Sequence, residues 1–298
     1  MENILFIGRS GLLMYINTHN KQSRGKAKMI HTFKELVQYR GLLWDLAIKD
    51  MKVRYRNPYL GFVWALLVPL LMVFIFKFVF STILRGGVEQ YPFFIYLMTA
   101  IFPWVFFSSA VESASESIVN NQELIKKTYF PRHIIPMSAV LASLLNFIPA
   151  FLVMHFLMLC FGIKPSILIL IAPVAILLQT ILAAGLALLL SSVYVVLRDV
   201  KYIIQIMLMA WFYLSPGIYS LSTIERLSER LLNAYTLNPF TGLFSLYRMA
   251  LLPDFASTLP TQVNVVWLYA WTAFVCVAVF FIGIFVFKRL EPYFSDLI

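Results

Sequence analysis

Six long runs of apolar residues dominate the sequence. A helix of about 20 residues crosses a hydrocarbon core of about 30 Å, and each run is close to or above that length. The runs cover residues 61–80, 92–111, 134–161, 167–197, 202–219 and 263–287. The third and fourth are longer than one span needs, which is typical of tilted helices. The pattern predicts an all-α integral membrane protein with six transmembrane helices.

The segment ahead of the first run, "HTFKELVQYRGLLWDLAIKDMKVRYR", repeats apolar positions with a helical period. Most of its charged residues fall opposite the apolar stripe. This predicts an amphipathic helix within residues 31–57 that lies at the membrane interface. A short helix that packs on the protein itself is the alternative, because Arg40 and Gly41 interrupt the stripe. Asn57 and Pro58 then turn the chain into the membrane domain, residues 58–298.

The region 220–262 differs from a simple loop. Ser222 and Glu225 have the spacing of a capping box, and Asn238 followed by Pro239 is typical of a helix start. These signals predict two short helices on the outer side, the second too short to cross the membrane. Irregular backbone at membrane depth must be covered by protein or line a cavity. A re-entrant pair of helices is therefore expected here.

Composition agrees with a membrane protein. Hydrophobic residues make up 61% of the 298 residues and charged residues 13%, whereas soluble domains have about 25% charged residues. The mean hydropathy is +0.82. The net charge of +10 comes from basic residues at membrane flanks, which favours anionic lipid headgroups over nucleic acid as their partner. Cys160 and Cys276 both lie in apolar runs, so no disulfide framework is expected.

Lysines and arginines lie mainly on one side of the predicted spans. That side holds the segment before the first span, the 120–133 loop, Arg198, Lys201, Lys288 and Arg289. The other side holds Arg85, Lys164, Arg226, Arg230 and Arg248. Because cytoplasmic loops carry the excess of basic residues, both termini are expected in the cytoplasm. Charges follow the short apolar patches of the N-terminus, which is the reverse of a cleavable signal peptide. Residues 1–30 are therefore expected to form a cytoplasmic extension.

The sequence lacks the common catalytic motifs. It has no G-x-x-x-x-G-K-[ST], H-E-x-x-H or G-x-S-x-G pattern, and its four histidines are scattered. We expect no catalytic residue, no metal site and no bound cofactor. The outer acids Glu89, Glu225, Glu229 and Asp254 are the alternative, as an acid/base pair of a membrane-embedded glycosyl or acyl transferase. Glu225 and Glu229 alternate with arginines one helical turn apart, a pattern that favours a solvated helix face.

Aromatic residues make up 16% of the chain, and many fall in the middle of predicted spans. Their flat apolar faces suit a path along which sugar rings slide, although packing against lipid explains most membrane aromatics. The candidates for a channel lining are Phe74, Phe102, Trp104, Phe106, Trp211, Tyr213 and Tyr219.

The stretch "NNQELIKKTYFPR" stands between the second and third runs. Its first part favours a short helix, which Phe130 and Pro131 end. Such a helix would lie across the cytoplasmic face of the membrane and offer polar groups to a partner. Those groups are Asn121, Glu123, Lys126, Lys127, Tyr129 and Arg132. A charged anchor that only fixes topology is the alternative.

Three separated segments carry a resemblance to a known family. They are "VRYRNPYLGFVWALLVPLLMVFIF", "SESIVNNQELIKKTYFPRHIIPMSAV" and "LSPGIYSLSTI" with "LNPFTGLFSLYR" after it. In this order they resemble the ABC-2 type permeases that export lipid-linked polysaccharides or teichoic acids. The resemblance covers the chain from about residue 31 onward and leaves the first 30 residues outside it.

The resemblance implies a homodimer of six-span subunits in a bacterial inner or plasma membrane. Two copies of a separate ATP-binding subunit would bind ATP and Mg²⁺, so this chain would be a transport subunit and not an enzyme. O-antigen, capsule and teichoic acid exporters look alike at this level. An ABC-2 permease for a drug or a simple lipid is the nearer alternative, and the membrane transferase is the more distant one.

The resemblance also implies roles for parts of the chain. The loop at about 120–133 becomes the coupling helix that sits on the ATP-binding subunit. Residues 31–57 become a gate helix near the lipid entry, with Arg54 and Arg56 as candidate contacts for the phosphates of a polyprenyl-diphosphate-linked glycan. Glu112 and Glu116 become a candidate relay between the second span and the coupling helix, and an ordinary pair at the membrane interface is the alternative. The short outer helices at about 220–262 would close the exit of a channel at the dimer axis.

Overall fold

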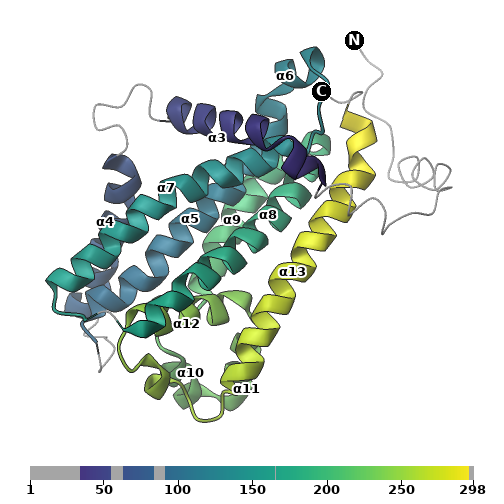
Figure 1. Cartoon of the computed structure of the whole chain (residues 1–298). Helices are drawn as coiled ribbons and strands as arrows, with labels where there is room; N and C mark the ends of the chain where they lie inside the picture. The colour runs from purple at the N-terminus through teal and green to yellow at the C-terminus, as the bar shows by residue number, and fades with distance from the viewer. Residues whose placement is uncertain (1–33, 55–62, 84–90, 165, 295–298) are drawn as a thin grey trace. The chain divides into compact units, whose positions relative to one another are not determined.

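The structure is a computed structural model of the whole chain, and it describes residues 34–54, 63–83, 91–164 and 166–294 (Figure 1). The predicted extension 1–30, the Asn57 and Pro58 turn, Arg56 and Glu89 lie outside these residues. The chain divides into two compact units, Met1–Tyr39 and Arg40–Ile298. In the first unit, residues 34–38 are helical and Tyr39 N donates to Glu35 O at 2.8 Å. All elements named below belong to the second unit.

The described part of the second unit consists of helices and the turns between them, which confirms the all-α class. The inner and membrane elements are α3 (Arg40–Arg54), α4 (Trp64–Lys77), the π-helix η2 (Phe78–Ile83), α5 (Phe93–Asn120), α6 (Gln122–Lys127), α7 (Ile134–Cys160), η3 (Ile167–Ile171), α8 (Ala172–Val196) and α9 (Val200–Tyr213). They are followed by α10 (Leu221–Leu227), α11 (Glu229–Leu237), α12 (Pro239–Leu251), η4 (Phe255–Thr258), α13 (Val265–Leu290) and η5 (Glu291–Tyr293).

Within the described residues, five segments are long and apolar enough to cross a membrane. They are Trp64–Ser81, Phe93–Asn120, Ile134–Cys160, Ile167–Val196 and Val265–Tyr293. The expected span over 202–219 is wrong in its length, because α9 has only 14 residues and ends at Tyr213. Pro216 and Gly217 follow in a turn, and both residues disfavour a continuing helix. The count of six spans stays a prediction.

Helix α5 lies at the centre of the packing. Most of its 28 residues are buried, and it packs against α7, α8 and α4 (Figure 1). It also runs on to Asn120, past the expected end of the second span at residue 111. The long helix therefore leads directly into residues 120–133, which are called the coupling segment below after the role predicted for them.

Helices α8 and α13 form the other main pair (Figure 1). Their backbones approach closely where Gly185 faces Gly283, since a Cβ atom added to Gly283 would lie 2.1 Å from Gly185 O. Small residues at a helix crossing are typical of membrane interiors, where close van der Waals packing replaces the hydrophobic effect.

A helix is confirmed within the segment 31–57, as α3, and its place at the membrane interface stays a prediction. The helix packs on α7 and buries Leu46 and Ala47, while Trp44 and Val53 remain 50% and 62% exposed. Part of α3 thus packs on the protein, as the alternative expected, while other apolar side chains of the helix remain exposed.

The outer region folds into three short helices, where two were expected. The cap of α10 is Ser220, whose Oγ accepts from Thr223 N at 3.3 Å, so the capping box at Ser222 is wrong. Helix α10 ends at Leu227 and α11 begins at Glu229. Glu225 and Glu229 therefore stand in different helices, against the expectation of one continuous face.

Helix α12 is the last of these three helices and corresponds to the second of the two that the sequence predicted. It begins at the predicted residues. Asn238 Oδ1 accepts from Phe240 N at 3.0 Å, and Pro239 is the first helical residue. At 13 residues α12 is too short to cross a bilayer, as expected. Nearly all of it is buried, so the protein covers this backbone at depth.

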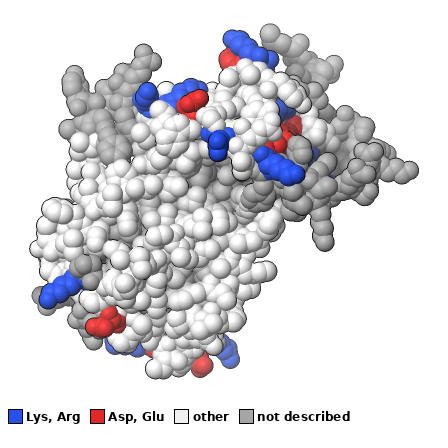
Figure 2. Space-filling model, in the orientation of Figure 1, with Lys and Arg blue, Asp and Glu red and all other residues white. Residues whose placement is uncertain are grey.

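Charged side chains gather at two ends of the visible face in Figure 2, with a wide uncharged band between them. The band is the surface that a hydrocarbon core would cover.

Candidate functional site

Helix α6 is the most exposed polar element of the coupling segment. None of its six residues is buried, and it ends at Lys127, before the expected stop at Phe130. Lys127 Nζ lies 3.2 Å from Glu123 Oε2, with both side chains more than 70% exposed. Tyr129 is fully exposed at 102%. Helix α6 and Tyr129 thus present charged groups and one aromatic ring to the surroundings.

Two other residues predicted for the coupling segment face the chain itself. Arg132 Nη1 donates to Glu291 O at 3.0 Å, which ties the end of the loop to the end of α13. Asn121 Oδ1 accepts from Lys49 Nζ of α3 at 2.9 Å. These bonds fix the position of α6. The partner surface is therefore formed by Glu123, Lys126, Lys127 and Tyr129, and its role stays a prediction.

Helix α6 follows almost directly on α5. Only Asn121 separates the two helices. Asn121 N donates to Ser117 O of α5, and Leu124 N of α6 donates to Asn121 O, both at 3.1 Å. Asn121 is therefore bonded to both helices, and a transmission of movement from α6 to α5 stays a prediction.

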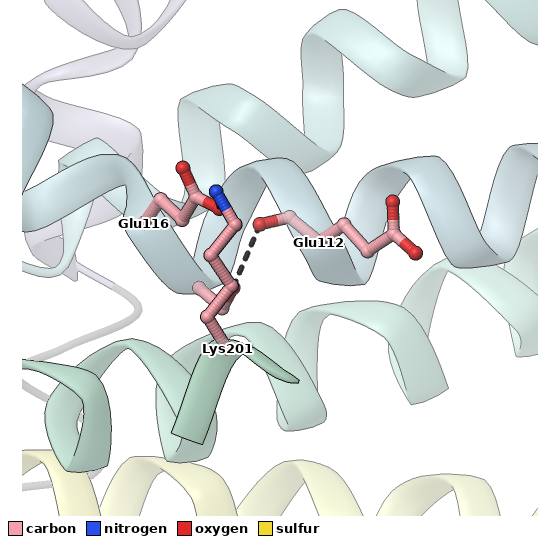
Figure 3. A network of polar contacts seen from close by, with 4 residues as sticks. Glu112, Glu116 and Lys201 are labelled. Atoms are coloured by element: carbon pink, nitrogen blue, oxygen red, sulfur yellow. Dashed lines mark hydrogen bonds and ion pairs between the residues drawn. The ribbon is translucent and has the colours of Figure 1, made fainter. Parts of the chain in front are cut away.

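One of the two candidate relay residues has a partner on another helix. Lys201 Nζ, in the first turn of α9, lies 2.8 Å from Glu116 Oε1 on α5. Figure 3 shows Lys201 reaching toward Glu116, with Glu112 one turn away on the same helix. The expected pair thus becomes a contact between α5 and α9, in which Glu116 makes the ion pair.

A polar pocket of about 410 Å³ lies between α3 and the inner half of α5. Its charged lining residues are Lys49, Asp50, Arg54 and Glu116. Burial raises the pKa of Asp50 above its usual value, and the nearby Lys49 and Arg54 oppose that shift. The pocket mixes both signs of charge at the end of the molecule that carries α6.

Arg54 lines this pocket and also bonds to α5 beyond it. Its Nη1 donates to Ser109 Oγ on α5 at 3.0 Å. Ser109 lies about 16 Å from the α6 end of α5, at 1.5 Å per residue. Of the two arginines predicted to contact phosphate, Arg54 thus lies against the middle part of α5, while Arg56 lies outside the described residues.

The predicted channel aromatics separate into two groups. Phe102, Trp104 and Phe106 are at most 5% exposed, and the Trp104 ring centroid is 4.8 Å from Phe240. These three rings are part of the folded core, which corrects their placement on an open path.

The other four aromatics lie nearer the surface. Phe74 and Tyr213 are 64% and 47% exposed. Trp211 Nε1 donates to Asn238 Oδ1 at 3.0 Å, and the Tyr219 hydroxyl is 2.9 Å from that of Tyr235. The channel role stays a prediction for Phe74 and Tyr213, whereas Trp211 and Tyr219 help to hold the outer region together.

Arg248, one of the basic residues expected on the outer side, lies inside the protein and is only 2% exposed. Its Nη1 and Nη2 donate to Pro216 O and Gly217 O, each at 2.7 Å, and its Nε donates to Thr99 Oγ1 at 3.3 Å. The guanidinium carbon lies 3.7 Å from the ring centroid of Tyr96. Arg248 thereby joins α12, the turn after α9 and the outer half of α5.

No grouping of three or more potential metal ligands occurs among the described His, Cys, Asp and Glu residues. Glu225 and Glu229 are on separate helices, and Glu89 lies outside the described part.

Comparison with known proteins gives consistent matches. Residues 42–252 match the family model of the ABC-2 type transporter. A protein of Myxococcus xanthus named O-antigen export system permease protein RfbA is 34% identical over 220 residues, which are 74% of this chain and 84% of that protein. Two Klebsiella pneumoniae proteins of the same name are 31% and 30% identical over 213 residues, 70% of this chain and 80% of each relative.

Proposed function

This chain belongs to the ABC-2 type transporter family, and from that premise we propose that it is the transmembrane subunit of an ATP-driven exporter of O-antigen polysaccharide. The observation that carries the proposal is the match to three O-antigen export permeases over 70% or more of the chain. The matched region includes α3, α6 and the outer helices. These are the elements that the proposal requires to couple, admit and release the substrate.

ATP hydrolysis belongs to a separate subunit in this proposal. The sequence has no P-loop, the backbone cradle that binds nucleotide phosphates in ABC ATPases. Two copies of an ATP-binding partner would bind ATP and Mg²⁺ and receive α6 in a surface cleft. The exposed Tyr129 and the charged residues of α6 support a docking role for this helix.

Helix α5 is the proposed lever between the two ends of the transporter. Its inner end continues into α6, and Glu116 there holds α9 through Lys201. Toward its outer end, Tyr96 Oη donates to Tyr219 O at 3.2 Å, and Thr99 accepts from Arg248. Thr99 and Glu116 are about 25 Å apart along the helix. A movement of α6 during ATP hydrolysis would thus reach the outer helices through one rigid element.

The substrate in this proposal is a glycan on a polyprenyl diphosphate. It would enter from the cytoplasmic side beside α3, and its sugar chain would pass through a channel between two copies of this chain. Helix α9 supports the dimer, since its 14 residues are fewer than a span needs and most of its apolar side chains are exposed. Phe74 and Tyr213 are the exposed aromatics proposed to face the sugar.

The proposed orientation follows the basic residues. Cytoplasmic loops carry the excess of lysine and arginine, and the end that holds α3 and α6 contains Lys49, Lys52, Lys126 and Lys127. We therefore assign that end, both termini and α6 to the cytoplasmic side of the inner membrane.

Deletion of the gene in the source organism tests this function. The expected result is loss of the polysaccharide from the cell surface and accumulation of its lipid-linked form inside the cell, with both effects reversed by the wild-type gene. Surface labelling and analysis of extracted lipid-linked glycan give the two readouts. Unchanged surface polysaccharide in the deletion strain would contradict the proposal.

A further inference from the structure

A second, smaller pocket lies between α4, α5, α7 and the end of α3. Its volume is about 70 Å³. Four polar residues line it: Arg54, Ser109, Ser143 and Asn146. The remaining wall is apolar and includes Pro69 and Phe106. Because Arg54 also lines the 410 Å³ pocket on the cytoplasmic side, the two pockets meet at this side chain.

Two side chains in this pocket have polar atoms without a partner. Ser143 is 2% exposed and Asn146 is 7% exposed. Within the part of the chain that the structure describes, neither Ser143 Oγ nor Asn146 Nδ2 and Oδ1 has a hydrogen-bond partner. Buried polar atoms are nearly always hydrogen-bonded in native proteins, so each exception needs an explanation. A ligand that enters the pocket and bonds to these atoms explains both exceptions.

The pocket lies deep in the membrane region. Asn146 is about 18 Å from the start of α7 and Ser109 about 16 Å from the end of α5, so both are near the middle of long apolar helices. A cation at this depth is costly unless it is paired. The described lining of the pocket contains Arg54 and no aspartate or glutamate. Asp50, a carboxylate near Arg54, lines the larger pocket and not this one. The charge that complements Arg54 inside the small pocket is therefore an anion from outside the chain.

The donors in the pocket match one class of anion. A guanidinium presents N–H groups in a planar fork that fits the oxygens of phosphate, and hydroxyl and amide groups add further donors. A pocket that encloses a whole small molecule has about 300–1,000 Å³, so 70 Å³ accommodates a group of only a few heavy atoms. One phosphate satisfies both conditions, while the rest of its molecule stays outside.

We propose that Arg54, Ser109, Ser143 and Asn146 bind a phosphate group of the lipid-linked substrate within the membrane region. This inference rests on the proposed export function, which supplies a diphosphate attached to a lipid. The first phosphate enters the small pocket, and the second remains in the larger polar pocket that shares Arg54. Free phosphate has the same chemistry, but the apolar walls and the depth of the site favour a phosphate that a lipid chain carries into the membrane.

Binding to the purified full-length chain in mild detergent tests the site. The probe is a radiolabelled polyprenyl diphosphate, with inorganic phosphate and the unphosphorylated polyprenol as competitors. Arg54→Gln and Asn146→Leu are each expected to weaken binding at least tenfold. Arg40→Gln, the same charge change on an exposed residue at the other end of α3, is expected to change it less than twofold.

Thermal unfolding separates binding from folding. Asn146→Leu removes a buried amide that has no partner, so the variant is expected to unfold at the same temperature as wild type or higher. Weakened binding in a variant of unchanged stability supports the site. Binding like that of wild type in both variants would overturn it, and so would a loss of stability in Asn146→Leu without a change in binding. A chain that binds inorganic phosphate but not the polyprenyl diphosphate would overturn the lipid assignment.

An export assay distinguishes this inference from the function on which it rests. If wild type exports polysaccharide and both variants export it equally well, the phosphate site is wrong and the exporter stands. If wild type does not export but binds polyprenyl diphosphate through Arg54 and Asn146, the site stands and the exporter is wrong.

Discussion

Lys201 of α9 and Glu116 of α5 form an ion pair of 2.8 Å near the end of α5 that continues into α6. Their side chains are 39% and 26% exposed, so solvent screens the pair and it contributes little to stability. Its position is more informative than its energy. It links the short helix α9 to the long helix that carries the coupling segment.

Breaking this pair is expected to affect coupling more than folding. In Lys201→Glu two negative side chains face each other, so α9 no longer follows α5. The amount of polysaccharide exported per ATP hydrolysed is expected to fall severalfold, while the unfolding temperature changes little. Reconstituted transporter, assayed for both quantities, gives the ratio.

The charge-swapped double variant is the control for this pair. Glu116→Lys combined with Lys201→Glu restores opposite charges at the same positions and is expected to recover most of the lost ratio. A double variant as defective as Lys201→Glu alone would show that the two residues act independently.

The close contact between α8 and α13 predicts that replacing Gly283 by alanine changes the free energy of unfolding in the opposite direction from the same change at Gly41, which lies outside the contact. A Cβ at Gly283 would meet the backbone carbonyl of Gly185, which cannot move without separating the helices. Gly283→Ala is expected to lower the free energy of unfolding by about 1–3 kcal/mol or more. Gly41→Ala in α3 meets nothing within 4 Å and is expected to raise it by about 0.4–1 kcal/mol. Thermal unfolding in detergent measures both, and equal effects would contradict the packing described.

The hydrogen bonds of Arg248 predict that a positive charge alone does not maintain stability at this position. Lysine keeps the charge but lacks the fork that reaches Pro216 O and Gly217 O together. Arg248→Lys is therefore expected to cost about 2 kcal/mol or more, because buried carbonyls lose their donors. Arg226→Lys, on the exposed side of α10, is expected to stay within about 0.5 kcal/mol. An Arg248→Lys variant as stable as wild type would show that the two hydrogen bonds from Arg248 to Pro216 O and Gly217 O do not stabilise this turn.

Local signals in the sequence predicted much of the fold. The apolar runs predicted α5, α7, α8 and α13, because any helix that crosses a bilayer must be long and apolar. Asn238 and Pro239 predicted the start of α12 through chemistry confined to one turn. The end of α9 was missed although Pro216 and Gly217 were visible, since the apolar run continues past them.

The candidate site depended more on tertiary contacts. A positive-inside count treats every arginine alike, so it could not separate the buried Arg248 from the exposed Arg226. Asn146 and Ser143 stand in an apolar run with no local pattern, and only the meeting of α7 with α5 and α3 brings them to Arg54. The prediction for the aromatic residues failed for the same reason. Trp104 was a channel candidate because of its residue type and its place in an apolar run, whereas its packing puts it in the core.

The most direct test of the exporter account is to isolate the chain from native membranes in mild detergent and identify the co-purifying proteins by mass spectrometry. The compared variant combines Lys126→Glu and Lys127→Glu on the exposed surface of α6 with Tyr129→Ala, two residues after the end of that helix. Arg226→Glu with Arg230→Glu, exposed charge reversals on the outer helices, is the control. The account predicts an ATP-binding subunit in comparable amount with wild type and with the control, and its loss from the α6 variant. An ATP-binding subunit that stays with the α6 variant, or that is absent from wild type, would contradict the account.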